Sequence, residues 1–342
     1  MTYLSYIANK LGLALLTLFG LSLIIFLISH VIPGDPARLE LGPLATQAQV
    51  LNLRRELGLN LPLPVQYGNY LWGLLHGNFG ISLVTQHNVW HDIATRLPAT
   101  LELVLAATLL ILVIGVPLGA LAARYQNSWI DGLFRLLSIG GVVTPSFFAG
   151  ILLQIVFGYF LNVLPVSGEV ALGVPYSGHP TGMPVLDGLL RGNWPLFLNA
   201  LRHLILPAVS LALADLGQVA RITRASMIDV SRKEYVRAQR SYGLSDASMT
   251  FKYMLKPSFI PSLTLLGLAF ASLLGNAFLV ELVFSWPGIA SYAAKAILQK
   301  DINAVMGVVL VFGVFFVVTN FLVDILAGYV NPRLRLGTQA EG

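Results

Sequence analysis

Six long apolar stretches run through this sequence, and they restrict its fold more than any other feature. They cover residues 11–32, 99–122, 133–161, 201–222, 259–282 and 305–330. A helix needs about 20 residues to cross the hydrocarbon core of a bilayer, and each stretch has that length. The stretches are continuously apolar rather than alternating, which favours helices over the strands of a membrane barrel. The sequence therefore predicts an all-α polytopic membrane protein with six transmembrane helices.

The scarcity of charge supports this fold class and excludes others. Charged residues make up 11% of the chain and apolar residues 56%, whereas a soluble domain carries about 25% charged residues. A soluble enzyme is excluded, and so is a disordered chain, because disorder requires low hydrophobicity and high charge. The chain has no cysteine, which excludes disulfides, thiolate metal sites and a cysteine nucleophile.

The basic residues predict how the spans are oriented. Residues 11–32 are too long for the apolar core of a signal peptide and no A-x-A pattern precedes Pro33, so we interpret them as a retained span. Of the 21 Lys and Arg residues, 13 then lie on the side of both termini and 8 on the other side. The positive-inside rule predicts that both termini and the loop between spans four and five are cytoplasmic.

Two sizeable extracytoplasmic loops follow from this orientation, at residues 33–98 and 162–200. They either fold as small caps over the external mouth or serve as connectors, although a connector of this length is unusual. His87 and His91 have the i,i+4 spacing that can bind a metal on a helix. A single such pair in a polar loop is a weak pattern, and we expect no metal site.

The loop between spans four and five, residues 223–258, has the most informative local pattern. Ser231 and Glu234 have the spacing of a helix capping box. Gly243 suits the left-handed position that ends a helix. We therefore expect a short helix over residues 232–241.

A second short helix is expected after this one. Ser245 and Asp246 suit its start, and Pro257 would stop it. One face of the first helix carries Tyr235, Ala238 and Tyr242. Such a helix pair is either a docking surface for a partner or a basic segment in contact with anionic lipid.

This loop resembles the cytoplasmic coupling loop of binding-protein-dependent ABC importer permeases, in particular their dipeptide, oligopeptide and nickel branch. The matching residues are Glu234, Tyr235, Val236, Arg237, Ala238, Gly243 and Leu244. Further stretches resemble the same branch in order along nearly the whole chain, among them Ile32-Pro33-Gly34-Asp35-Pro36, Gly77-Asn78-Phe79-Gly80, Leu97-Pro98-Ala99-Thr100, Glu281-Leu282-Val283-Phe284-Ser285-Trp286-Pro287-Gly288 and Asn331-Pro332-Arg333. The chain departs from the general importer pattern at Arg237-Ala238-Gln239, where that pattern has Glu-Ala-Ala, and from the branch at Ser241 and Tyr242.

The resemblance implies a type I importer permease subunit in the plasma (inner) membrane. It implies a first helix with an extracytoplasmic loop at 1–98, a five-helix core at 99–330 and a cytoplasmic tail at 331–342. The implied partners are a second homologous permease, two ATPase subunits, an extracytoplasmic binding protein and membrane lipid, with no nucleic acid. The chain has no G-x-x-x-x-G-K-[ST] loop, which agrees with ATP and Mg being bound by the ATPases and no cofactor by this chain.

The resemblance also implies a cargo and a set of coupling residues. Di- and oligopeptides moved by alternating access are the expected cargo, with nickel chelates or other small solutes of the same branch as the alternative. ATPase coupling is assigned by resemblance to Glu234, Tyr235, Arg237, Ala238, Tyr242, Gly243 and Leu244.

Breaks within the spans suggest a path for cargo. Pro117, Pro145 and Pro207 would permit kinks in spans two, three and four. Span three is irregular at Thr144, Pro145 and Ser146, and irregular backbone at membrane depth is buried in protein or lines a cavity. Gly115 and Gly119 would allow two helices to approach closely.

Four carboxylates lie within the apolar stretches, and such residues are functional candidates. Glu102 and Glu281 are expected near the external ends, where water solvates them. Asp324 is expected to be structural. Asp215, deeper in span four, either lines the path together with residues 144–146 or pairs with a basic group such as Arg221 or Arg224.

Three other classes of protein remain as alternatives. A proton-coupled secondary transporter would show inverted repeats and carboxylate relays, and no repeat is found. An intramembrane enzyme is disfavoured because H-E-x-x-H and G-x-S-x-G are absent and every histidine falls at a span end or in a loop. A channel would have no use for a capped docking helix.

Overall fold

The computed structural model describes residues 3–31, 36–42, 44–56, 58–174, 176 and 180–330, and in this part of the chain the regular structure is helical. A lone antiparallel bridge pairs Ile81 with Asn88. The α-helices are α1 Tyr3–Val31, α2 Pro36–Leu41, α3 Gln47–Glu56, α4 Leu63–Leu75, α5 Val89–Leu110, α6 Val116–Arg124, α7 Trp129–Val143, α8 Ser146–Leu153, α9 Pro184–Leu190, α10 Trp194–Ser231, α11 Glu234–Ser241, α12 Asp246–Ser248, α13 Leu255–Val283, α14 Ile289–Leu298 and α15 Ile302–Val330. Three π-helical stretches join them, η1 Ile111–Gly115, η2 Gln154–Phe160 and η3 Met249–Met254.

Five helices in the described part are long and apolar enough to cross a membrane: Ile7–His30, Val89–Arg124, Trp194–Ser231, Met249–Val283 and Ile302–Val323. A sixth span is formed if Trp129–Val143 and Ser146–Phe160, bent by 109° at their junction, are taken together. Five of the six predicted spans are therefore confirmed as single helices, and the third corresponds to the bent pair. Their ends extend further than expected: α5 starts ten residues before the predicted span at 99, and α10 continues to Ser231.

Prolines inside two spans are accommodated by π-helical turns. Pro117 follows η1, and Pro257 follows η3. A proline removes one hydrogen bond and its ring crowds the carbonyl of the preceding turn, and the wider π turn leaves room for that ring. The prediction that Pro257 stops the second short helix is therefore wrong. The helix runs without a break from Met249 through Pro257 to Val283.

Helix α10 forms the centre of the molecule and packs against α5, α6, α7, α8, α9 and α13. Small residues allow these close approaches. A Cβ at Gly217 would lie 2.6 Å from the carbonyl oxygen of Ser138 in α7, and one at Gly119 would collide with the carbonyl oxygen of Ala220. The predicted close packing at the Gly115 and Gly119 pair is confirmed, with α10 as the neighbour.

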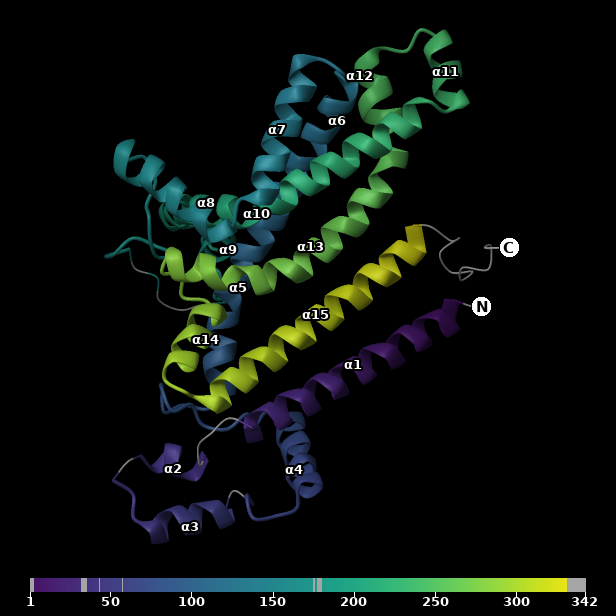
Figure 1. The fold of residues 1–342 in the computed structure, drawn as a ribbon. Helices are drawn as coiled ribbons and strands as arrows, with labels where there is room; N and C mark the ends of the chain where they lie inside the picture. The colour runs from purple at the N-terminus through teal and green to yellow at the C-terminus, as the bar shows by residue number, and fades with distance from the viewer. Residues whose placement is uncertain are drawn as a thin grey trace.

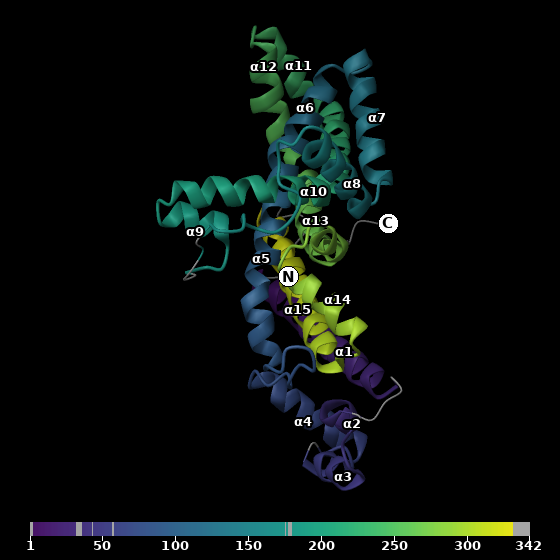
Figure 2. The ribbon, with the colours of Figure 1, turned by 90° about the vertical axis from the view of Figure 1, so that its left-hand side faces the viewer.

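The two ends of the molecule carry different elements. Figures 1 and 2 show α11 and α12 at one end and α2, α3 and α4 at the opposite end, and Figure 2 shows the α9 segment extending sideways. Helices α1 and α15 lie side by side, and both run between α2–α4 and the region of the two termini. Both long loops predicted from the sequence thus contain helices, α2–α4 in one and α9 in the other.

Candidate functional site

The short helix α11 projects at one end of the molecule (Figure 1). Its Val236 is fully buried, in an apolar cluster that includes Ala120 of α6, Met227 of α10 and Met249 of η3. Through this side chain the helix contacts three other segments of the chain. Sequence reasoning missed Val236 as the anchor, although it is the one branched aliphatic residue in this helix.

The remaining predicted residues of this segment face outward. Glu234, Tyr235, Ala238, Tyr242 and Leu244 are all exposed, Tyr242 to 83%. The face predicted to carry Tyr235, Ala238 and Tyr242 is thus an open surface. The side chain of Arg237 lies outside the described residues.

The two ends of α11 form differently. Gly243 has a φ of +75° and occupies the predicted left-handed position. The predicted capping box does not form: Ser231 is the last residue of α10 and its hydroxyl donates to the carbonyl of Ile228 at 2.6 Å. Because α10 extends this far, α11 begins at Glu234 rather than at Arg232.

Below α11, a buried carboxylate joins α7 to α10. Asp131 has no exposed surface and accepts hydrogen bonds from Nε of Arg224 at 2.6 Å, Nη2 of Arg224 at 2.8 Å and Nη2 of Arg135 at 2.6 Å. The backbone N–H of Asn127 donates to the same carboxylate at 3.0 Å. Arg224 therefore pairs with Asp131, and the alternative in which it pairs with Asp215 is wrong.

The predicted irregularity in span three is a sharp corner. Helix α7 ends at Val143, Thr144 and Pro145 have extended backbone, and α8 starts at Ser146. The buried hydroxyl of Ser210 in α10 donates to the carbonyl of Ser146 at 2.6 Å, which fixes the corner to the central helix. Thr144 donates to the carbonyl of Gly140 at 2.7 Å.

Asp215 lies on a different side of α10 from this corner. The α7 contacts of α10 include Leu213 and Gly217, and a residue two positions away on a helix is turned by about 200°. Asp215 is half-buried and has no hydrogen-bond or ion-pair partner among the described residues. The structure therefore does not bring Asp215 together with residues 144–146.

Glu102 and Glu281 are not solvated at span ends, which corrects the expectation from the sequence. Glu102 accepts from the N–H of Val185 at 2.9 Å, at the start of α9. Glu281 is fully buried and accepts from the Thr100 hydroxyl at 2.6 Å and from the N–H of Ser291 in α14 at 2.9 Å. Both carboxylates bind free N–H groups at a helix start. The side chain of Asp324 lies outside the described residues.

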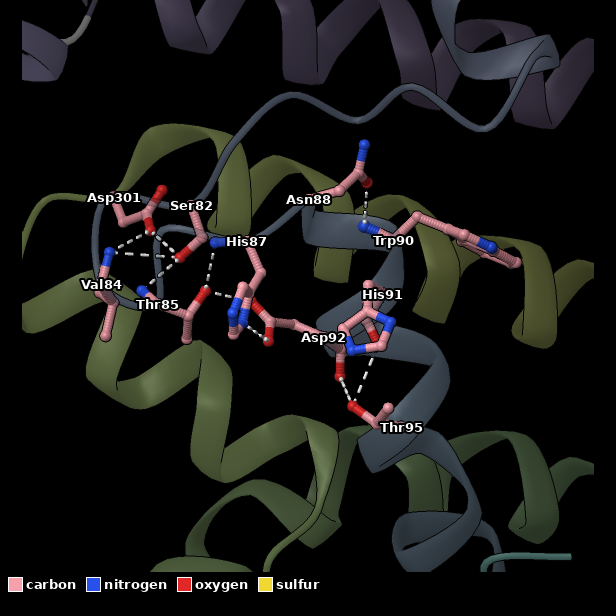
Figure 3. A network of polar contacts seen from close by, with 10 residues as sticks. All are labelled: Ser82, Val84, Thr85, His87, Asn88, Trp90, His91, Asp92, Thr95 and Asp301. Carbon is pink, nitrogen blue, oxygen red and sulfur yellow. Dashed lines mark hydrogen bonds and ion pairs between the residues drawn. The ribbon is translucent and has the colours of Figure 1, made fainter. Parts of the chain in front are cut away.

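A polar network joins the loop after α4 to the start of α15 (Figure 3). The buried Asp301 accepts from the Ser82 hydroxyl at 2.6 Å and from the N–H of Val84 at 3.2 Å, while its other oxygen accepts from the N–H of Ala304 at 3.1 Å. Nδ1 of His87 lies 3.9 Å from Oδ1 of the buried Asp92. Within the described residues no group of three His, Asp or Glu side chains is arranged to hold a metal.

Comparison with known proteins agrees with this architecture. Residues 115–336 match the model of the family described as binding-protein-dependent transport system inner membrane component, and residues 3–104 match the model of its N-terminal part. A probable D,D-dipeptide transport system permease protein of Escherichia coli is 42% identical over 98% of this chain and 99% of its own length. A di/tripeptide transport system permease protein of Pseudomonas aeruginosa is 41% identical over 97% and 99%, and a glutathione transport system permease protein of Escherichia coli is 34% identical over the same shares.

These matches extend over nearly the whole chain and include both the spans and the α11 segment. The chain therefore belongs to the family of inner membrane components of binding-protein-dependent transport systems, as a multi-pass permease subunit.

Proposed function

We propose that this chain is a permease subunit that carries di- or oligopeptides inward by alternating access, driven by ATP hydrolysis on separate ATPase subunits. The cargo assignment is supported by the names of its relatives, which transport dipeptides, di/tripeptides and glutathione. All three are short peptides with charged ends. A nickel chelate has no comparable support among these relatives.

Helix α11 is the coupling element in this proposal, and its attachment is the observation that carries it. An exposed surface with Tyr235 and Tyr242 is joined by buried Val236 to a cluster from α6, α10 and η3. A push on the exposed surface by an ATPase subunit would reach three segments at once. The exposed Leu244 completes the docking surface, Arg237 is assigned to it by the family resemblance alone, and α11 lies on the cytoplasmic side together with both termini.

The polar side of α10 is the proposed wall of the translocation path. Asp215, Gln218 and Arg221 recur at three-residue steps, are half-buried or exposed, and have no hydrogen-bond or ion-pair partner in the described part of the chain. Polar groups at this depth rarely face lipid. A second homologous permease subunit would cover them, so that the path lies between the two subunits. The corner at Thr144, Pro145 and Ser146 contacts another side of α10 and is not part of this wall.

The docking assignment can be tested with single cysteines, because the natural chain has none. A Tyr242→Cys variant is compared with a Leu75→Cys variant in α4, whose side chain is 80% exposed at the opposite end of the molecule. In membranes that contain the whole transporter, a short bifunctional thiol-to-amine reagent should join the ATPase to the first variant only. Equal labelling of both variants, or a cross-link from Leu75→Cys alone, would overturn the proposal.

A further inference from the structure

Two adjoining cavities lie where α1 ends and α15 begins. The larger one has a volume of about 460 Å³ and lies between α1, α3, α4 and α15. The smaller one, of about 270 Å³, lies between α1, α14 and α15. Ser29, Lys300, Ile302 and Met306 line both cavities. The larger volume is in the range of small-molecule sites.

Basic side chains line the larger cavity, together with apolar ones. Arg54, His30 and Lys300 line it, and no acidic side chain does so among the described residues. The hydroxyl of Tyr70 is buried there without a hydrogen-bond partner in the described part of the chain. Burial raises the pKa of Tyr70 to about 12, so the hydroxyl keeps its proton and can donate. These groups favour an anionic ligand.

Lys300 occupies a backbone position that glycine usually takes. Lys300 has a φ of +57°, in the left-handed region, at the turn from α14 to α15. Glycine or asparagine is the usual residue there, and other residues adopt it at a cost of about 1–2 kcal/mol. The side chain of Lys300 makes no ion pair with any described residue and lines both cavities.

The smaller cavity is an apolar groove at the edge of the membrane. Ile25 and Ile28 line it from the end of one span, and Val305 and Val309 line it from the start of another. Asp301 is in its wall, and its carboxylate accepts hydrogen bonds from Ser82 and Val84 (Figure 3) and from the N–H of Ala304. The groove therefore lies at the depth of lipid chains, and the polar cavity lies at the depth of headgroups.

We propose that the two cavities together bind one anionic phospholipid. Its phosphate-containing headgroup contacts Arg54, Lys300 and Tyr70, and one acyl chain lies in the groove between α1 and α15. Basic pockets between membrane helices bind such headgroups. The charge of the polar cavity selects an anionic lipid over a zwitterionic one, and the groove favours a lipid over a free anion.

The test measures the lipid retained by the whole transporter after purification from membranes of phosphatidylglycerol and phosphatidylethanolamine. The double variant Arg54→Gln with Lys300→Gln removes both lining charges. The control, Arg55→Gln with Lys295→Gln, removes two nearby exposed charges outside both cavities. We expect the first variant to retain phosphatidylglycerol about 30-fold more weakly than wild type, and the control to match wild type.

A groove variant separates the lipid from other occupants. Val309→Trp fills the apolar groove and leaves the polar cavity intact, and it should also reduce retained phosphatidylglycerol. Equal retention in all variants would overturn the proposal. So would inorganic phosphate that binds as tightly as the lipid and is unaffected by Val309→Trp, which would indicate a free-anion site. A cross-link from a Val309→Cys variant to the second permease in the intact transporter would identify a subunit interface instead.

Discussion

At the scale of single residues, Asp131 joins α7 to α10 through a buried ion pair with Arg224. Its carboxylate is fully buried and accepts from two arginines, of which Arg224 is 20% exposed and Arg135 is 54% exposed. The loss of one partner from a buried ion pair leaves an uncompensated charge, which costs about 3–5 kcal/mol. The loss of an exposed partner costs at most about 1 kcal/mol. The loss of the Arg224 pair is therefore expected to destabilise the protein more than the loss of the Arg135 pair.

We expect Asp131→Asn to destabilise the protein by about 3–5 kcal/mol, because Arg224 would be left buried without its full charge partner. Arg135→Gln is the control and should cost at most about 1 kcal/mol. Both variants are measured by unfolding of the purified protein in one detergent. Equal losses in the two variants would contradict the assignment of Arg224 as the buried partner.

Asp215→Asn tests the proposed path at the same scale. Asp215 has no partner among the described residues, so the substitution should leave the unfolding temperature unchanged. We expect the maximal rate of peptide uptake to fall about tenfold if the carboxylate contributes about 1.4 kcal/mol to passage of the positively charged peptide end. Unchanged uptake, or a lower unfolding temperature, would indicate that Asp215 does not line the path.

At the scale of elements, the turn after α11 depends on the left-handed backbone of Gly243. Its φ is +75°, and a Cβ there would meet no atom within 4 Å. Proline fixes φ near −65°, whereas asparagine tolerates the left-handed region. Gly243→Pro should therefore abolish transport-coupled ATP hydrolysis, and Gly243→Asn should keep it within about twofold of wild type. Coupled ATP hydrolysis at the wild-type rate in Gly243→Pro would show that the turn at Gly243 does not transmit movement from the ATPase to the spans.

The loop between η2 and α10 should loosen as pH rises. Burial raises the pKa of Glu169 to about 7, above an ordinary value of about 4.3. Between these two values the Glu169 carboxyl is protonated in the folded loop and ionised in the unfolded loop. The contribution of Glu169 to the stability of the loop is therefore fully present below pH 4 and is lost as the pH rises through about 7. The pKa of Asp187 is shifted in the opposite direction. Burial raises this pKa, but hydrogen bonds from Thr181 and Tyr176 lower it by more, so that it lies below its ordinary value. Its contribution is constant above pH 5 and is lost only in acid.

Hydrogen exchange measures this effect. After correction for intrinsic rates, amides of residues 161–174 should be less protected at pH 8 than at pH 5. Glu169→Gln should remove the difference, because the amide does not titrate. A pH dependence that persists in Glu169→Gln would assign it to another group.

The elements that the sequence predicted are those with a local pattern. The spans follow from length and apolarity, and Gly243 follows from the left-handed position that ends α11. The anchor Val236, the pairing of Asp131 with Arg224 and the capping roles of Glu102 and Glu281 depend on contacts between distant segments. The prediction for Pro257 failed because the π turn before it is not visible in a propensity pattern.

At the scale of the whole molecule, one central helix connects the proposed docking surface to the proposed path. Helix α10 carries the polar residues of the proposed path, contacts the break between α7 and α8, and ends beside α11. Movement of α11 would thus be passed to the path through one continuous helix of 38 residues. A secondary transporter would need no such connection to an external ATPase.

The most direct test is uptake of a labelled dipeptide into proteoliposomes that contain the whole transporter, with and without ATP. The account predicts uptake that requires ATP and the binding protein, and that is lost in Val236→Asp, which disrupts the anchor of α11, while Val236→Ile retains it. Uptake by this chain without ATP or an ATPase subunit, or full ATP-dependent uptake in Val236→Asp, would contradict the claim that α11 couples ATP hydrolysis to peptide transport.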